Sequence, residues 1–238
     1  MRVAVGTSGY SYKEWKGHFY PDDLKPSDFL RYYGTRFRTV EINNTFYRMP
    51  TEELLASWAT QVPDGFTFVL KASQKMTHRK RLKECGEELQ YFVRTAATLG
   101  DKLGPTLFQL PPYLKKDLPR LQDFLTLLPQ GWRAAFEFRD ASWFDEEVTG
   151  LLKAHGAALV AAETDPDESP LEVPFVPTTD WGYLRLRRKA YDHAALAAWA
   201  AKIQGAGWRE AFVFFKHEDE ATGPRLAAQF MQLLEGTT

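Results

Sequence analysis

Apolar and polar side chains alternate at the start of the stretch formed by residues 39–47. Val40 and Ile42 are apolar, whereas Glu41 and Asn43 are polar. Because successive side chains of a β-strand point to opposite faces, this stretch predicts a strand with one apolar and one polar face. The apolar face carries β-branched residues, which favour packing against helices. The polar face is then directed towards whatever the sheet encloses.

The same alternation returns in residues 134–140. Here Phe136 and Phe138 are the apolar members, and Glu137 and Arg139 are the polar ones. A second strand is therefore predicted to carry charge on one face near its C-terminal end. The two stretches indicate where chemistry could take place, but they do not specify a reaction.

Strand-like and helix-like patterns alternate along the whole chain, with one unit roughly every thirty residues. Eight such units favour a closed parallel barrel over an open doubly wound sheet. The predicted fold is α/β: a single (β/α)8 TIM-type barrel with parallel strands that occupies residues 1–238 as one domain. The expected strands are residues 2–8, 39–47, 66–71, 106–110, 134–140, 158–163, 183–187 and 211–217.

The helix starts are predicted from capping residues. Thr51, Asp117 and Ser142 each precede a segment with helical apolar spacing, and their side-chain oxygens can accept from the first turn. Residues 165–180 contain four prolines, too many for an ordinary helix. We therefore expect a Pro-rich loop in place of the sixth helix.

The composition is that of a globular chain, with 44% hydrophobic and 14% aromatic residues. Cys85 is the only cysteine, so no intrachain disulfide can form. The longest apolar run, residues 194–201, is far shorter than the roughly 18 residues of a membrane span. The apolar run after Met1-Arg2 is too short for a signal peptide. A cytoplasmic location and no membrane partner are expected.

Charged side chains should gather at one end of the predicted barrel. In TIM-type barrels the active site lies at the C-terminal ends of the strands. Desolvating a charge costs several kcal/mol unless it is paired, so a cluster there is best explained if a polar ligand shares the site. For any single residue, the alternative is an ion pair between strands. The positions expected in the lumen are Glu41, Asn43, Lys71, Gln109, Glu137, Arg139, Glu163, Arg185 and Arg187.

These residue types suggest roles. Glu41 and Glu137 are the candidate acid/base carboxylates, and Lys71 is a candidate proton donor or charge partner. Arg139 and Arg185 can clamp an anion, because a guanidinium presents a rigid fork of donors. We expect each glutamate to lie within hydrogen-bond reach of one of these cations.

The loop from Gly9 to Pro26 is unusually aromatic for a solvated connection. We expect it to lie across the mouth with Tyr10 or Trp15 facing the pocket; the alternative is a plug packed over the barrel edge. The complete predicted ligand-binding set is Thr7, Ser8, Tyr10, Trp15, Asn43, Gln109, Arg139, Trp143, Arg185 and Arg187.

Cofactor and metal signals are weak. The chain has no GxxxxGK[ST], GxGxxG or CxxC motif, so no nucleotide fingerprint is present. With five histidines, a multi-zinc site is not expected. A single oxygen-preferring divalent ion would have to use Glu41, Glu137, Glu163 and His217. We predict neither a cofactor nor a metal.

Seven groups of residues carry a family resemblance. They are Gly6-Thr7-Ser8-Gly9-Tyr10, Trp15 with Gly17 and Phe19-Tyr20-Pro21, Val40-Glu41-Ile42-Asn43 with Thr45-Phe46-Tyr47, Thr77-His78, Leu103-Gly104, Gln109-Leu110-Pro111-Pro112, and Glu137-Phe138-Arg139 with Ser142-Trp143. In combination they resemble the domain of unknown function 72, also called YecE-like. The resemblance runs from the first strand to the last helix. It implies a TIM-type barrel and no established activity.

The expected ligand is a small anionic molecule, such as a phosphorylated one. One alternative is a nucleic-acid binder or endonuclease-like barrel that uses the basic segment Lys71–Lys83, which holds six Lys or Arg and no acid. Another is a carbohydrate-active barrel with Trp15, Trp143 and Trp181 as stacking platforms. A non-catalytic scaffold is the third. Neither the reaction nor the oligomeric state follows from the sequence.

Overall fold

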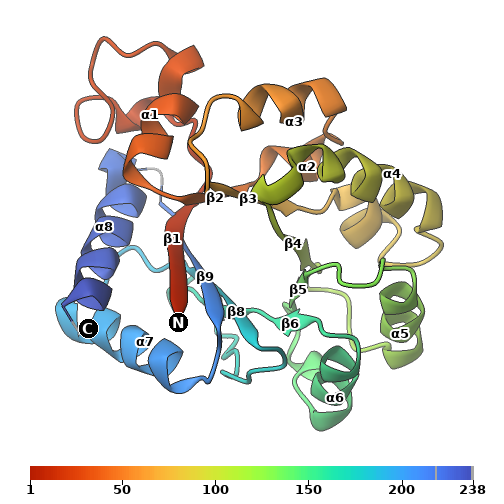
Figure 1. The fold of residues 1–238 in the computed structure, drawn as a ribbon. Coiled ribbons are helices and arrows are strands. Elements are labelled where there is room, and N and C mark those ends of the chain that lie inside the picture. Colours follow the sequence, from red (N-terminus) through yellow and green to blue (C-terminus); the bar gives the residue numbers. More distant parts are fainter. Residues whose placement is uncertain (218, 237–238) are drawn as a thin grey trace.

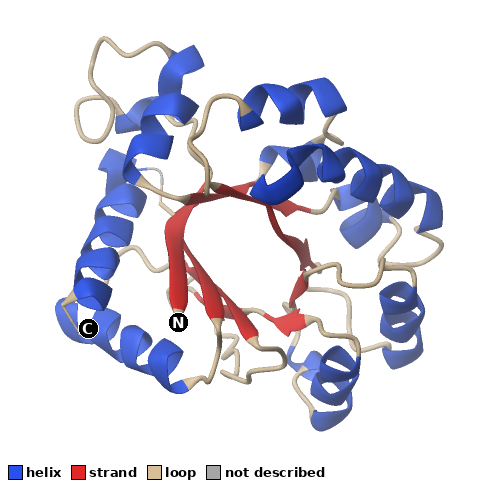
Figure 2. Cartoon of the chain, viewed as in Figure 1, coloured by secondary structure: helices blue, strands red, loops and turns tan. Residues whose placement is uncertain are grey.

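A ring of parallel strands surrounded by helices forms the protein (Figures 1 and 2). The computed structural model describes residues 1–217 and 219–236. Within these residues, nine parallel strands pair in the order β6-β5-β4-β3-β2-β1-β9-β8-β7. The strands are β1 (Arg2–Ser8), β2 (Thr39–Ile42), β3 (Thr67–Lys71), β4 (Leu103–Gln109), β5 (Ala134–Glu137), β6 (Ala158–Leu159), β7 (Ala161–Glu163), β8 (Trp181–Leu186) and β9 (Glu210–Phe215).

The ring is closed by the chain itself. Strands β6 and β7 are separated only by Val160, β6 pairs with β5, and β7 pairs with β8. The pair therefore corresponds to one predicted strand, residues 158–163, interrupted at a single position. The predicted α/β TIM-type barrel with parallel strands is confirmed.

The helices lie outside the ring (Figure 2). Between β7 and β8 no helix forms, so the predicted Pro-rich loop in place of the sixth helix is confirmed. The α-helices of the described residues are α1 (Phe29–Arg36), α2 (Asn44–Tyr47), α3 (Glu52–Ala59), α4 (Gly86–Ala96), α5 (Leu118–Thr126), α6 (Glu146–Ala154), α7 (His193–Gly205) and α8 (Thr222–Glu235).

The apolar residues form two separate cores, one on each face of the sheet. The larger lies between sheet and helices and includes Val40 and Ile42, as the alternation predicted. The smaller fills the lumen and includes Val69, Leu107 and Phe214. Apolar side chains fill the rest of the lumen, and polar side chains occupy its C-terminal end.

Two of the three predicted helix caps are confirmed. Thr51 accepts from Leu54 N at the start of α3, and Asp117 accepts from Arg120 N at the start of α5. The prediction that Ser142 caps a helix is wrong, because Asp145 accepts from Val148 N and caps α6. Ser142 lies one turn earlier.

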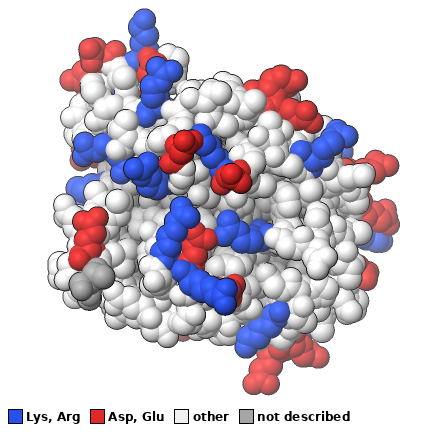
Figure 3. All heavy atoms as spheres, viewed as in Figure 1, with Lys and Arg blue, Asp and Glu red and all other residues white. Residues whose placement is uncertain are grey.

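Charges of both signs are spread over the visible surface. On the face in Figure 3, Lys and Arg side chains lie among Asp and Glu side chains, including near the centre of the ring. This face therefore offers no broad basic area of the kind that attracts nucleic acid. None of the described helices combines the length and apolarity needed to span a bilayer.

A matched pair of glycines tests the strand packing. A Cβ on Gly6 would lie 2.1 Å from the Thr39 carbonyl oxygen of the neighbouring strand, whereas a Cβ on Gly150, inside α6, would meet nothing within 4 Å. Gly6→Ala should therefore lower the free energy of unfolding by about 1–3 kcal/mol, as overpacking does. Gly150→Ala should raise it by about 0.5–1 kcal/mol, because alanine is the better helix former. Urea denaturation of the two variants measures both changes, and a neutral Gly6→Ala would contradict the packing described.

Candidate functional site

Arg185 is the centre of a buried ionic cluster at the C-terminal end of the barrel. Its Nη2 donates to Glu41 Oε1 at 2.9 Å, and its Nη1 donates to Glu137 Oε2. The three side chains are almost fully buried, with exposed fractions of 3% for Arg185, 0% for Glu41 and 1% for Glu137. One guanidinium thus bridges two carboxylates that come from distant strands.

Strand parity explains why these side chains meet. Glu41 is the penultimate residue of β2, Glu137 ends β5 and Arg185 is the penultimate residue of β8, each on the lumen face. The register pairs Ser8 with Glu41 and Gln109 with Glu137. Parallel strands place their carboxyl ends at one end of the barrel, so residues nearly 150 positions apart, such as Glu41 and Arg185, come into contact.

Every carboxylate oxygen in the cluster accepts a hydrogen bond. Besides the bonds to Arg185, the Tyr183 hydroxyl donates to Glu41 Oε2 at 2.6 Å, and Arg139 Nε donates to Glu137 Oε1 at 2.6 Å. Asn43 Nδ2 adds a longer contact of 3.4 Å to Glu41 Oε1. These donors satisfy the two buried anions, which removes most of the cost of desolvating them.

Both carboxylates are held ionised. Burial by itself favours the protonated form, but the Arg185 charge and the Tyr183 hydrogen bond more than offset it and keep the pKa of Glu41 below its usual value. For Glu137, burial is outweighed by Arg185, Arg139 and Arg187, and its pKa is also lowered. A carboxylate with a depressed pKa cannot donate a proton near neutral pH. The predicted role of general acid therefore does not suit either glutamate.

Two cations at the mouth lack an anionic partner. Neither Lys71 nor Arg187 forms a side-chain hydrogen bond or ion pair with any described residue, and Arg187 Nε is buried. Burial lowers the pKa of Arg187 to about 10; Glu137 opposes this shift, and the charges of Arg185 and Arg139 add to it. Burial and the Arg185 charge lower the pKa of Lys71 to about 7.

Phe46 connects Lys71 with a histidine. Lys71 Nζ lies 4.1 Å from the centroid of the Phe46 ring, and the His78 ring packs edge-on against the same phenyl group at 4.9 Å. His78 Nδ1 forms a 2.9 Å hydrogen bond with Thr77 Oγ1. Burial and the positive charges of Lys71 and Arg139 lower the pKa of His78. The mouth thus holds two bases whose protonation is disfavoured by their surroundings.

The geometric prediction about the glutamates is confirmed. Glu41 and Glu137 both point into the lumen, each in hydrogen-bond contact with an arginine. Tyr10 and Asn43 line a common hollow of about 60 Å³ next to Gly9. The N-terminal part of the aromatic loop therefore reaches the rim beside β2.

Four predicted positions belong to the scaffold instead. Trp15 is 1% exposed and packs against Tyr12, Phe19 and Tyr20, and Trp143 stacks on Phe138 with its Nε1 bonded to Leu114 O. Both rings are buried by their own neighbours, so neither can stack on a ligand.

The other two face the helices. The Thr7 hydroxyl donates to Gly9 O and is bonded to the Tyr33 hydroxyl, outside the lumen. Glu163 accepts from Trp199 Nε1 on α7 at 2.8 Å, so its predicted position in the lumen is wrong. Ala158, Val160 and Ala162 pack in the lumen core, whereas Leu159 and Ala161 belong to the outer core, so the alternation continues through Val160 and directs Glu163 outwards. Residues 158–162 are apolar on both faces, so their pattern does not indicate which face is the lumen.

Tyr183 is a site residue that the sequence argument missed. It lies two positions before Arg185 on the same strand, so the alternation that selected Arg185 places Tyr183 on the same face. Its aromatic ring belongs to the lumen core, and only its hydroxyl reaches Glu41. Because tyrosine counts as an apolar residue in the strand pattern, the pattern does not predict a hydrogen bond from the Tyr183 hydroxyl.

The described residues contain no group of three His, Cys, Asp or Glu side chains that could hold a metal ion. Glu41 and Glu137 are bonded to Arg185, and His217 Nε2 contacts Arg187 O at 2.8 Å. The four residues considered for a divalent ion therefore do not form a site.

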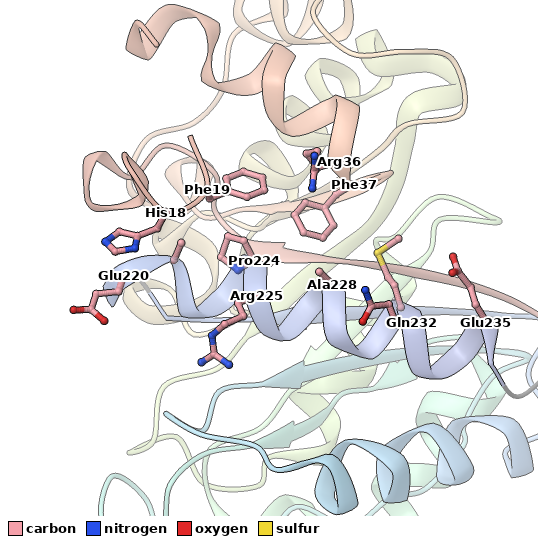
Figure 4. A pocket seen from close by; sticks show the side chains of 12 residues that line it. His18, Phe19, Arg36, Phe37, Glu220, Pro224, Arg225, Ala228, Gln232 and Glu235 are labelled. Atoms are coloured by element: carbon pink, nitrogen blue, oxygen red, sulfur yellow. The ribbon is translucent and has the colours of Figure 1, made fainter. Parts of the chain in front are cut away.

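A larger groove lies outside the barrel. It has a volume of about 470 Å³ between α8 and the segment that carries Phe19 and Phe37, and Arg36 and Arg225 also line it (Figure 4). None of its lining residues belongs to the Arg185 cluster. This groove and the buried ionic cluster are thus in different places.

Comparisons with known proteins agree on the family. The family model described as "Protein of unknown function DUF72" matches residues 4–238. UPF0759 protein YecE of Escherichia coli (strain K12) is 31% identical over 124 residues, a segment that covers 50% of this chain and 46% of YecE, so the match spans about half of that relative. UPF0759 protein YunF of Bacillus subtilis (strain 168) is 25% identical over 92% of this chain and 79% of YunF.

Solved structures give the same picture. A DUF72 family protein of Thermotoga maritima MSB8 matches with a TM-score of 0.87 and 30% identity, covering 99% of this chain and 100% of that one. A xylose isomerase domain protein of Alicyclobacillus acidocaldarius matches with a TM-score of 0.51 and 15% identity, over 98% and 97% of the two chains. The second likeness shows a shared fold alone.

Removing the central cation should be costly. In Arg185→Met the two buried carboxylates would lose their shared partner, so we expect the free energy of unfolding to fall by roughly 3–5 kcal/mol. Arg188→Met is the matched control, since its 3.6 Å contact with Glu163 is partly exposed and is expected to contribute at most about 1 kcal/mol. Denaturant unfolding followed by circular dichroism compares the two, and equal losses would show that the Arg185 cluster does not stabilise the fold.

The same variant should change the pH dependence of stability. In the wild type the folded-state pKa values of Glu41 and Glu137 are depressed, so their contribution is complete above the unfolded value of about 4.3 and is lost as the pH falls. In Arg185→Met, burial dominates and raises the folded-state pKa values of Glu41 and Glu137. Proton uptake by the two glutamates then stabilises the folded variant as the pH falls. The stability gap between wild type and Arg185→Met should narrow from about pH 7 to about pH 4. A gap that stays constant over this range would contradict the assignment.

Proposed function

The chain belongs to the DUF72 family, a family of unknown function, and from that premise we propose that the barrel mouth binds a small anionic molecule and acts on it with Lys71 as the reacting group. The observation that carries the proposal is Arg187, a largely buried guanidinium that has no partner among the described residues. A desolvated cation of this kind is costly unless an anion accompanies it.

The charge balance at the mouth supports an anionic ligand. Arg139, Arg185 and Arg187 are three guanidinium groups, whereas Glu41 and Glu137 are the two carboxylates within the cluster. Arg185 uses both of its terminal nitrogens on these carboxylates, and Arg139 uses its Nε on Glu137. The remaining donors of Arg139 and Arg187 suit a carboxylate or phosphate, which accepts two N–H groups from one fork.

Proton transfer at neutral pH is assigned to Lys71 and not to the glutamates. A group is most effective in acid–base catalysis when its pKa lies near the working pH. The pKa of Lys71 is lowered to about 7 by burial and the Arg185 charge, whereas those of Glu41 and Glu137 are moved further from neutrality. In this proposal the glutamates position Arg185 and balance its charge.

The alternatives receive less support from the side chains. In the basic segment 71–83, Lys75 and Lys80 both bond to Glu88 at 2.8 Å, which reduces the charge available to a polynucleotide. The three tryptophans considered for sugar stacking, Trp15, Trp143 and Trp181, are each less than 9% exposed. The basic segment therefore does not favour nucleic-acid binding as a second candidate function, and the tryptophans do not favour sugar binding.

A thermal scan with added anions tests the proposal. A ligand at 100 times its dissociation constant adds about 2.7 kcal/mol to the stability of the state that binds it, which corresponds to a rise in Tm of about 5–10 °C for a chain of this size. We expect such a rise for at least one of phosphate, sulfate, a sugar phosphate and a small carboxylate, measured at constant ionic strength.

The rise in Tm should disappear in Arg187→Met, because methionine retains the aliphatic part of the side chain but lacks the unpaired guanidinium. It should persist in Arg79→Ala, an exposed cation of the basic segment. The same rise with chloride at matched ionic strength would indicate general screening and refute a specific site. Loss of the rise in Arg79→Ala but not in Arg187→Met would move the anion site to the basic segment.

A further inference from the structure

We infer that Lys71 is a nucleophile that forms an imine with the carbonyl group of a small 2-oxo acid bound at the barrel mouth. The inference rests on the proposed function, since it names the substrate class and the reaction of the same anion site. It starts from the surroundings of the Lys71 amine, which differ from those of an ordinary structural lysine.

The position of Lys71 is fixed while its amine remains free. Lys71 is the last residue of β3, its carbonyl accepts from Thr45 Oγ1 at 2.7 Å, and the strand register pairs it with Leu107. The amine packs against the Phe46 ring and has no carboxylate within ion-pair distance among the described residues. A lysine that served only to balance charge would be expected to contact Glu41 or Glu137, but Arg185 occupies both.

The electrostatic surroundings favour the neutral, nucleophilic amine. Desolvation against an apolar ring and nearby cations are the two means by which a lysine is activated for covalent chemistry. Both apply here, because burial together with the Arg185 charge lowers the pKa of Lys71 to about 7. At neutral pH about half of the amine is then unprotonated, compared with less than about one part in a thousand for an ordinary lysine.

The arginines determine which carbonyl compounds fit. Arg185 and Arg139 are both close enough to Lys71 to lower its pKa, and Arg139 and Arg187 retain free donors. A carboxylate held by these donors would bring an adjacent carbonyl carbon towards the amine. This arrangement favours a carbonyl next to the anionic group, as in a 2-oxo acid, over a neutral aldehyde.

The step is balanced without any oxidant or metal. The Lys71 Nζ lone pair forms a bond to the carbonyl carbon, and one proton passes from the nitrogen to the carbonyl oxygen to give a neutral carbinolamine. The second nitrogen proton is then transferred to the hydroxyl group, the carbon–oxygen bond breaks, and water leaves. Amine plus carbonyl thus gives imine plus water. His78, which packs against the same Phe46 ring, is the base available to exchange these protons.

Reductive trapping on the wild-type chain tests the inference. The protein is incubated with glyoxylate at about pH 7 and treated with sodium cyanoborohydride, which reduces an imine to a stable secondary amine, and the modified lysine is located by peptide mass spectrometry. From the fraction of neutral amine we expect labelling of Lys71 to exceed that of exposed lysines such as Lys153 by at least about 100-fold. The labelling of Lys71 should reach half its maximum near a pH of about 7.

Three comparisons decide the outcome. Lys71→Arg should abolish the label at this position while keeping the positive charge. Arg187→Met should reduce labelling by glyoxylate much more than labelling by acetaldehyde, which has no carboxylate. Equal labelling of the wild type by the two aldehydes would overturn the assignment to 2-oxo acids.

Failure of this inference is distinguishable from failure of the proposed function. If phosphate or a carboxylate stabilises the protein but Lys71 is labelled no faster than Lys153, the anion site stands and the imine is refuted. If neither stabilisation nor selective labelling occurs, both are refuted. Selective labelling of Lys71 over Lys153, its pH dependence and the comparison of the two aldehydes are read from the wild-type chain, so these results do not depend on the folding of any variant.

Discussion

One guanidinium between two buried carboxylates organises the C-terminal end of this barrel. Arg185 cannot lose either glutamate without leaving a desolvated charge, and each glutamate depends on Arg185 in the same way. Since the three residues belong to strands on different sides of the ring, their bonds also fix how β2, β5 and β8 lie relative to one another. An apolar plug could have filled the same space, as it does deeper in the lumen. Since packing alone does not require an ionic cluster here, we attribute the cluster to function.

The consequences of this cluster extend to its neighbours. With all four carboxylate oxygens already bonded, the glutamates have little capacity left for other cations. Lys71 and Arg187 consequently have no anionic partner in the described part of the chain, in a region that excludes much of the solvent. The reactivity proposed for the mouth thus depends on Arg185 in two ways. Arg185 binds both carboxylates, and these carboxylates are then not available to the other cations.

The aromatic loop shows how composition can mislead. Its rings form a continuous packed group in which Tyr20 stacks on Phe29 and Trp15 meets Phe19 edge-on. These contacts join the loop to α1 and stabilise one edge of the barrel. Of the loop, it is the first residues, 9–12, with Tyr10 and Tyr12 among them, that line the hollow at the rim. Aromatic residues serve packing and ligand stacking equally well, so a list of residues cannot separate the two uses.

Local periodicity and local hydrogen bonds are enough to predict the strand–helix order, the lumen face of β2 and β5, and the cap residues Thr51 and Asp117. Parity also identified Glu41, Glu137 and Arg185 as neighbours. Folding of the ring decides which cation each carboxylate binds, that Glu163 faces α7, and that Lys71 has no anionic partner among the described residues. Those outcomes depend on distances between strands far apart in the chain and, for Glu163, on which of two apolar faces of residues 158–162 turns to the lumen. Alternation specifies the face on which a side chain lies, whereas its partner is set by the closure of the ring.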